Sequence, residues 1–288
     1  MHFLEFVDTI PDEDAAREFV RKARWRDGVV CPTCKGLDVL WMEAKCKWLC
    51  RNLWCHRQFS DRTGTLFEYS HIPLRKWLIG MFMFMADHRG ISSVRLAKLV
   101  DVSQKTAYYQ LQRLRGACEI DRDTLTDVVE IDEMHLDGKK KNQHLVKWNR
   151  HSGKRWKKQA VLGVFDQGGQ VVHLGVTSKE TEMEVLVSTL APGIVSEHKR
   201  AHVLGEICAT DIESALTLLK RIFNSTQLSW DKKHAQQYMN EVAFRMNECL
   251  SGKSTVESMQ TIIGNSVRLK TKAEVEHLKN PYFRPVQV

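Results

Sequence analysis

Five of the eight cysteines in this 288-residue sequence lie between positions 31 and 55, and no other feature constrains the fold as much. Cys31 and Cys34 form a Cys-Pro-Thr-Cys knuckle, in which two thiolates three residues apart can occupy two corners of a zinc tetrahedron. The second pair should come from Cys46, Cys50 and Cys55. We expect Cys50 and Cys55 to bind the metal and Cys46 to be the spare thiol.

Other interpretations of the cluster stay open, because His56 can substitute for a thiolate and unligated cysteines can pack in a small core. Cys118, Cys208 and Cys249 are solitary. Clustered cysteines in a chain that stays in the cytosol favour metal binding over disulfides. Bound Zn²⁺ would stabilise a domain with few apolar residues of its own. The sequence thus predicts a zinc ribbon within residues 1–62, after a helix over 9–25 that Thr9 caps.

The positive charge of the chain is concentrated in one segment. Residues 45–120 contain 13 basic and 5 acidic side chains, and this net charge of +8 equals that of the whole chain. Such a concentration is typical of nucleic-acid binding, because neutralised phosphates release counterions. A solubilising surface is the alternative.

No part of the sequence predicts a membrane partner. No apolar run approaches the roughly 20 residues that a membrane span needs. The N-terminal residues lack the basic and apolar segments of an export signal and contain many acids. We therefore expect a cytoplasmic, nucleoid-associated protein, or a nuclear one in a eukaryotic host.

Residues 91–118 divide into two helical patterns joined by Asp101-Val102-Ser103, after an apolar stretch over 77–86 that we interpret as core. Ser92 and Ser103 are residues that favour the N-cap position. The layout is that of a helix-turn-helix, and a generic helical hairpin is the alternative. The residues expected to face inward are Leu96, Ala97 and Leu99 on the first helix, and Ala107, Leu111 and Leu114 on the second.

Candidate DNA contacts lie on the second of these helices. Its first turns are where a helix-turn-helix reads the major groove, and basic residues further along suit phosphates. The expected contacts are Gln104, Lys105, Tyr108 and Tyr109 for the groove, and Arg113 and Arg115 for phosphates.

The pattern changes to strands from residue 128, where "VVEID" predicts a first strand. The segment "KQAVLGVFDQGGQVVHLGV" predicts a hairpin that turns at Gly168-Gly169. A helix is expected next, at "KETEMEVLVSTLA". This order indicates a mixed α/β domain. The intervening loop, 138–159, contains nine Lys or Arg, no acid, and two tryptophans. It suits DNA contact, with Lys139 and Lys140 among the candidates, and a solvated loop is the alternative.

Asp132 is the first candidate for catalysis. A carboxylate on a buried strand costs several kcal/mol unless it is paired, and a divalent cation is its natural partner. Two carboxylate-held Mg²⁺ ions about 4 Å apart can activate a hydroxyl and stabilise the leaving oxygen of a phosphodiester. Glu197 and Glu213 are the further acids. Lys220 lies two helical turns after Glu213, although an exposed Glu–Lys face explains that pair equally well.

Blocks in a consistent order give a more specific indication. The segments "RWRDGVVCPTC", "RQFSDRTGTLFEYSHIPLRKW", "GISSVRLAKLVDVSQKTAYYQLQRLR", "IDEMHLDGKKKNQH", "KKQAVLGVFDQGGQV", "IESALTLLKR" and "KHAQQYMNEVAFRMN" span most of the chain. Together they resemble the bacterial insertion-sequence transposases that join a zinc ribbon and helix-turn-helix to a ribonuclease H-like DDE domain, relatives of the eukaryotic Merlin elements.

The resemblance implies a multidomain α/β architecture. Its expected parts are a zinc ribbon over 1–62, a helix-turn-helix region over 63–122, a ribonuclease H-like core over 123–264 and a tail over 265–288. It also implies Mg²⁺ or Mn²⁺ at Asp132, Glu197 and Glu213, with Lys220 beside the phosphate. Partners would be double-stranded DNA, as element ends and target, and a second copy of the chain when two ends are synapsed.

The sequence departs from the family at several catalytic positions. Glu197 stands where the family has its second Asp, and the longer side chain moves the carboxylate by about an ångström or more. Only 16 residues separate Glu197 from Glu213, too few for the strand and helix that lie between these acids in the family. The family also has an Asn just before its third acid, and Thr210 stands at that position here. The family's Gly-Gly-Lys is Asp137-Gly138-Lys139 here. An active transposase and a catalytically decayed or domesticated DNA-binding copy therefore both remain open. A zinc ribbon factor of the transcription-elongation type would fit the Cys31–Cys34 knuckle but would explain nothing after residue 128.

Overall fold

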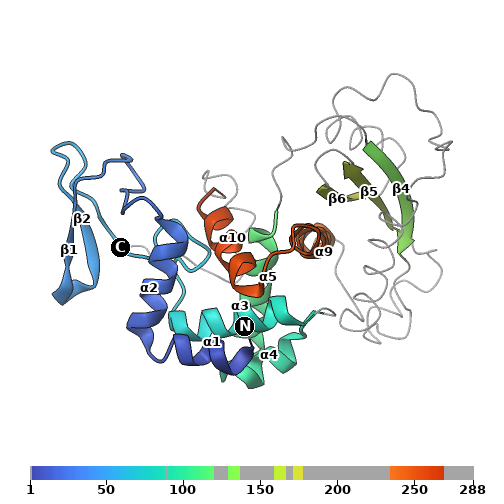
Figure 1. Ribbon diagram of the computed structural model, residues 1–288, viewed down its shortest axis with the longest axis horizontal. Helices are drawn as coiled ribbons and strands as arrows, with labels where there is room; N and C mark the ends of the chain where they lie inside the picture. The colour runs from blue at the N-terminus through green and yellow to red at the C-terminus, as the bar shows by residue number, and fades with distance from the viewer. Residues whose placement is uncertain are drawn as a thin grey trace, which may run out of the picture. The chain divides into compact units, whose positions relative to one another are not determined.

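The computed structural model describes residues 2–87, 90–119, 129–136, 159–166, 171–177 and 234–268 (Figure 1). The chain divides into two compact units, one made of Met1–Ala117 with Ser254–Val288 and the other of Cys118–Lys253. No helix within the described ranges is long and apolar enough to cross a membrane.

The first unit combines a small sheet with six helices in its described part. The strands are β1 (Val39–Met42), β2 (Lys47–Cys50) and β3 (Gln58–Phe59). The helices are α1 (Phe3–Thr9), α2 (Glu13–Arg24), α3 (Leu74–Ala86), α4 (Ser93–Val100), α5 (Gln104–Ala117) and α10 (Thr255–Arg268).

The N-terminal segment forms two helices, so the expectation of one helix over residues 9–25 is wrong. Thr9 is the last residue of α1 and does not cap the next helix. Ile10 leaves the helical conformation because it precedes Pro11, whose ring disfavours helical geometry in the preceding residue. Asp12 is the cap of α2, and its side chain accepts a hydrogen bond from the Ala15 amide at 2.8 Å.

The zinc-ribbon sheet is antiparallel, in the order β1-β2-β3. Trp41 pairs with Trp48 across the first two strands, and Trp48 pairs with Phe59 across the next two. Cys31, Cys50 and Phe59 are fully or almost fully buried at the centre of this part of the unit. Aromatic rings and the cysteines therefore form its small core, in place of a large set of aliphatic residues.

The pair of helices expected over residues 91–118 is present as α4 and α5. The Ser92 hydroxyl accepts from the Arg95 amide at 3.3 Å, and Ser103 accepts from Thr106 at 3.2 Å. Asp101 makes the turn in the left-handed conformation, with φ 51°. Both serines are thus confirmed as helix-capping residues.

The inward faces of these helices are confirmed except at one position. The residues that are buried as expected are Leu96, Ala97, Ala107, Leu111 and Leu114. Leu99 is 45% exposed, and Val100 is buried in its place. Because Val100 follows Leu96 by four residues, the two share one side of α4, and Leu99 lies towards solvent.

Helix α10 belongs to the first unit although it lies near the other end of the sequence. It contacts α2, α3 and α5, and its Met259, Ile262 and Ile263 are fully buried. Ser254 and Glu257 form a reciprocal capping box before it, with hydrogen bonds of 2.8 and 3.4 Å. The boundary expected at residue 264 falls inside this helix.

The described part of the second unit consists of three strands and a helix: β4 (Val129–Leu136), β5 (Gln159–Asp166), β6 (Val171–Thr177) and α9 (Ala235–Leu250). The strands form an antiparallel sheet in the order β4-β5-β6. Helix α9 packs along β6. The expected strand from residue 128 and the two strands of the expected hairpin are therefore present, whereas the turn at Gly168-Gly169 and the helix expected at 179–191 lie outside the described residues.

Candidate functional site

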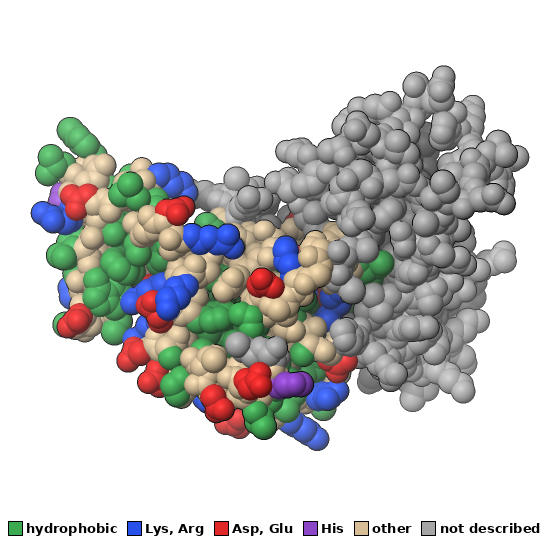
Figure 2. Space-filling model, in the orientation of Figure 1, with side chains coloured by type: hydrophobic (Ala, Val, Ile, Leu, Met, Phe, Trp, Pro, Cys, Tyr) green, Lys and Arg blue, Asp and Glu red, His purple; other side chains and the backbone are tan. Residues whose placement is uncertain are grey.

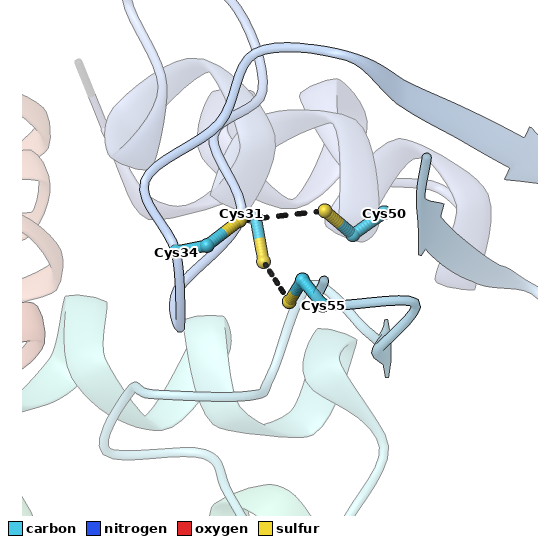
Figure 3. A group of neighbouring side chains, drawn as sticks. All are labelled: Cys31, Cys34, Cys50 and Cys55. Carbon is cyan, nitrogen blue, oxygen red and sulfur yellow. Dashed lines mark hydrogen bonds between the residues drawn. The ribbon is translucent and has the colours of Figure 1, made fainter. Parts of the chain in front are cut away.

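Four cysteines from two loops of the zinc ribbon point toward one another (Figure 3). Their sulfur atoms all lie within 4.8 Å of each other, and they are the residues Cys31, Cys34, Cys50 and Cys55. The Cys31 and Cys55 sulfurs are 3.7 Å apart, and those of Cys34 and Cys50 are 3.4 Å apart. A zinc tetrahedron with Zn–S bonds of about 2.3 Å requires about 3.8 Å, whereas a disulfide requires about 2.05 Å. The donor set fits structural Zn²⁺.

The two cysteine loops are built alike, although their spacings differ. In the tighter loop the Cys31 amide donates to the Gly36 carbonyl at 3.0 Å, and in the looser one the Cys50 amide donates to Arg57 at 3.0 Å. The residue after the second cysteine of each pair adopts the left-handed conformation, with φ 59° at Lys35 and 42° at His56. Each loop therefore reverses the chain and turns its two thiols inward.

Cys46 and His56 do not join the group of four. Cys46 is exposed at the end of a short 3₁₀ turn, and its sulfur lies 3.6 Å from Arg17 Nη1. His56 supplies the chain reversal described above. The choice of Cys50 and Cys55 as the second pair thus agrees with the geometry.

The thiols of the group differ in acidity. Burial raises the pKa of Cys31, but hydrogen bonds from the backbone N–H groups of Cys34 and Thr33 and from the neighbouring cysteine thiols together outweigh it and lower this pKa to about 7. Burial raises the pKa of Cys50 to about 12. Four thiolates in so small a volume repel each other, so a divalent cation would stabilise the ionised group, and its binding would release protons.

Asp61 joins the zinc ribbon to α2. This buried carboxylate accepts from Arg21 Nε and from Trp48 Nε1, both at 3.0 Å. The Arg21 guanidinium also lies over the Trp41 ring, 4.0 Å from its centroid. Arg24 donates to the Asp61 carbonyl, and burial lowers the pKa of Arg24 to about 10, so this guanidinium stays charged at neutral pH. The ribbon is thus fixed on its neighbouring helix by a charged network.

The candidate DNA contacts on α5 divide into two groups. Gln104 and Lys105 are exposed at the start of the helix, and Tyr108 and Tyr109 are half-buried. Arg113 instead donates to the carbonyls of Leu66 and Glu68 at 3.1 and 2.8 Å, and burial lowers its pKa.

Arg115 is only 2% exposed. Arg115 is therefore buried, and the half-buried Arg113 is held by two backbone carbonyls, which disfavours the phosphate contacts that we expected of them. Their charge made them candidates, but they lie on the packed side of the helix.

Of the candidate catalytic residues, the structure describes the backbone of Asp132 alone. It lies in the middle of β4, opposite Gly163 of β5. Glu197, Glu213, Lys220, Lys139 and Lys140 lie outside the described residues.

Trp54 was not among the residues expected to function. It lies in the four-residue insert between Cys50 and Cys55 and is 97% exposed. It also lines a surface hollow of about 380 Å³ beside the cysteines, together with Thr33, Cys34, Asn52, Cys55 and Arg57. An aromatic residue inside a metal-binding loop is the sequence signal that would have identified it.

Comparisons with known proteins agree with this zinc ribbon. Residues 11–58 match the family model of a transposase zinc-ribbon domain, of the IS1595 type. A protein of Halobacterium salinarum named as an uncharacterized protein in transposable element ISH50 is 35% identical over 133 residues. The match covers 45% of this chain and 44% of that relative, so less than half of either. No solved structure matches the chain. Residues 11–58 therefore form a transposase zinc ribbon, in a chain distantly related to a protein of a transposable element.

Proposed function

We propose that this protein is the transposase of an insertion sequence. It binds the ends of its element and catalyses metal-dependent cleavage and transfer of DNA strands. The observation that carries the proposal is the transposase zinc ribbon over residues 11–58, with its four cysteines in metal-binding geometry. The relative in a halobacterial transposable element supports it.

The zinc ribbon and the helices that follow it form the DNA-binding part in this proposal. Gln104 and Lys105 are exposed at the first turn of α5, and Tyr108 and Tyr109 follow them. Major-groove readout by these four side chains fits the start of a recognition helix. We leave Arg113 and Arg115 out of this interface because Arg115 is buried and Arg113 already donates to two backbone carbonyls. Lys139 and Lys140 would contact phosphates.

The catalytic part in this proposal is a ribonuclease H-like core. The antiparallel order β4-β5-β6, with α9 along β6, is compatible with such a core, and Asp132 lies on its first strand. Asp132, Glu197 and Glu213 would hold Mg²⁺ or Mn²⁺, and Lys220 would meet the phosphate. The bound ions would activate the attacking hydroxyl and stabilise the leaving oxygen of the phosphodiester.

The assembly and location follow from the same proposal. Strand transfer that keeps two element ends together requires a dimer or larger assembly on DNA. The ends and the target are both double-stranded DNA, so the protein would work on the nucleoid. We keep the divisions at residues 62 and 122 as proposed functional boundaries, but not the one at residue 264, which falls inside α10.

A catalytically decayed copy that acts only as a DNA-binding protein is the second candidate. Glu197 favours it, because an Asp is expected at this position and the longer side chain displaces the carboxylate. Such a copy would keep the zinc ribbon and α5 but would bind no catalytic metal.

The DNA on both sides of the reading frame separates the two candidates. An active transposase is expected to lie between matching terminal inverted repeats that are bounded by a short target duplication. Sequencing these flanks in the host genome tests this and supplies the substrate for biochemical work. Eroded or absent repeats would favour the DNA-binding copy.

A further inference from the structure

Folding does not use the side chain of Trp54. It is 97% exposed and its neighbour Leu53 is 82% exposed, the two highest values among the large hydrophobic residues of the described chain. By contrast, Trp25 and Trp41 both pack against Trp48 within the same ribbon. An indole left in water costs free energy that binding to a partner would recover.

The loop that carries Trp54 is well fixed. Asn52 is its centre: the side-chain oxygen accepts from the Trp54 amide at 3.0 Å, and the carbonyl accepts from Cys55 and His56 at 3.0 and 3.2 Å. Cys50 and Cys55 at the two ends of the loop point into the cysteine cluster. Because the backbone is already ordered, a partner would have little conformational entropy to remove on binding.

The surface around Trp54 is basic. Residues 31–35 and 50–58, the two cysteine loops, contain Lys35, Arg51 and Arg57 and no carboxylate. All three are exposed, and Figure 2 shows basic, hydrophobic and some acidic side chains on the zinc-ribbon end of the first unit. Arg51 has a long, exposed contact of 3.8 Å with Asp38, which water screens. This rim suits a polyanion better than an apolar protein surface.

The hollow of about 380 Å³ beside Trp54 adds groups that form hydrogen bonds. Arg57 and Asn52 line it, and Arg57 Nη1 donates to Thr33 Oγ1 at 3.3 Å. An aromatic face next to an arginine and an amide is the combination with which proteins hold a nucleobase and its phosphate. Stacked bases inside a regular duplex offer no free face, so the base must be unpaired or displaced.

We infer that Trp54 stacks on an unpaired or displaced base of DNA, with Arg51 and Arg57 beside the adjacent phosphates. The inference rests on the proposed function, because it takes DNA to be the partner of the zinc ribbon. It deepens that function by assigning the metal-binding loop to DNA whose base pairing is disturbed, as at a frayed or cleaved end. The helix α5 would bind the intact duplex.

The test uses the full-length, zinc-loaded protein and two mixed-sequence probes. One is a blunt duplex, and the other is the same duplex with a single-stranded tail that contains 2-aminopurine. Wild type is expected to prefer the tailed probe and to quench its fluorescence. Trp54→Ala should weaken binding to the tailed probe by roughly 5- to 100-fold and abolish the quenching, with little change on the blunt duplex. Trp54→Phe should retain most of both effects.

Two controls make the result specific. Tyr69→Ala removes another exposed aromatic side chain, outside the cysteine loops, and should leave tailed-probe binding within about twofold of wild type. The zinc content of each variant shows whether the ribbon is intact, which is expected because Trp54 makes no core contact.

Three outcomes would overturn the inference. If Trp54→Ala binds the tailed probe as tightly as wild type does, the inference fails and the proposed DNA-binding function stands. If wild type binds neither probe, the proposed function fails with it. If Trp54→Ala changes the oligomeric state in sedimentation and leaves DNA binding intact, Trp54 faces a second copy of the chain.

Discussion

At the scale of single residues, the two cysteine loops define the zinc ribbon. Two thiols three residues apart, followed by a pair with a four-residue insert, converge on one point although 16 positions separate Cys34 from Cys50. The left-handed residues Lys35 and His56 make the reversals that bring them there. Cys46 lies four residues before Cys50 and remains outside, because its own turn directs the sulfur toward Arg17.

Zinc binding should distinguish these thiols. We expect Cys50→Ser to reduce the zinc content from about one ion per chain to near zero, because it removes one of four ligands in a closed tetrahedral site. Cys46→Ser should keep the full content, because its sulfur faces away from the group. Elemental analysis of the purified variants measures this. Equal losses in the two variants would show that the ligand assignment is wrong.

The cysteine ligands could be predicted from the sequence because metal geometry restricts spacing strongly. The roles of Arg113 and Arg115 could not, since a basic residue on a helix suits a phosphate or a buried carbonyl equally well until its neighbours are known. The carbonyls of Leu66 and Glu68 that hold Arg113 belong to an irregular segment more than 40 positions away. No pattern in the sequence near Arg113 predicts such a contact. Trp54 was missed because hydrophobic patterns in a sequence identify residues that pack in a core, and Trp54 does not pack in one.

At the scale of elements, Glu13 links three parts of the first unit. Its carboxylate accepts from the Leu74 and Arg75 amides at 2.8 and 3.1 Å, and so caps the N-terminus of α3 from the first turn of α2. The residue at the cap of α3 is Pro73, which has no side-chain donor or acceptor. Glu13 also accepts from Arg62 at 3.1 Å, which ties the loop between the sheet and α3 to both helices.

Removal of this carboxylate should loosen the packing of the two helices. We expect Glu13→Ala to lower the free energy of unfolding by about 1–3 kcal/mol, as for a lost helix cap with an additional ion pair. The midpoint of thermal unfolding, followed by circular dichroism on the zinc-loaded protein, should fall by several degrees.

The matched control is Glu18→Ala on the same helix. Glu18 is 54% exposed on its side chain and pairs with Lys22 only at 3.6 Å, so its loss should shift the midpoint little. If the two variants shift the midpoint equally, Glu13 has no capping role.

Element types were easier to predict than element boundaries. Ser92 and Ser103 predicted the starts of α4 and α5, because a serine directly before a helical pattern commonly caps the helix. The break between α1 and α2 was missed because Thr9 resembles a cap equally well. Only the contacts of Asp12 decide between them. On the short helix α4, we expected Leu99 to be buried, but the next residue, Val100, is buried instead.

At the scale of the whole molecule, the chain returns to its beginning. Helix α10 completes the core of the first unit against α2, α3 and α5, after the sequence has passed through the second unit. The sequence alone did not predict this packing. The apolar face of α10 shows that the helix packs against another element, but it does not show which one. A fragment that ends near residue 118 would lack this helix. A DNA-binding copy without its C-terminal part would therefore be incomplete.

The return of α10 predicts a long-range effect of a single substitution. Ile263→Ala removes a fully buried side chain and should cost about 2–5 kcal/mol. Hydrogen exchange should then rise in α3 and α5, far away in the sequence, as well as in α10. Met239→Ala removes a fully buried side chain of α9 in the second unit and should raise exchange in α9 and β6 instead. A rise confined to α10 after Ile263→Ala would contradict the packing.

The proposed function requires this chain to cut DNA with a metal site that includes Asp132. Its most direct test is Mg²⁺- and Mn²⁺-dependent cleavage of a labelled duplex that carries the terminal repeats flanking the reading frame. Wild type should cleave at the repeat ends. Asp132→Asn should reduce cleavage at least about 1,000-fold and keep end binding, because it would remove a proposed metal ligand and leave the residues proposed to bind DNA unchanged.

Glu133→Gln is the control for this experiment, because it removes the next carboxylate along β4 and should keep most of the activity. Cleavage that survives in Asp132→Asn would show that Asp132 is not part of the catalytic site. Specific end binding by wild type without any cleavage would assign the chain to the DNA-binding copies that have lost their catalytic activity.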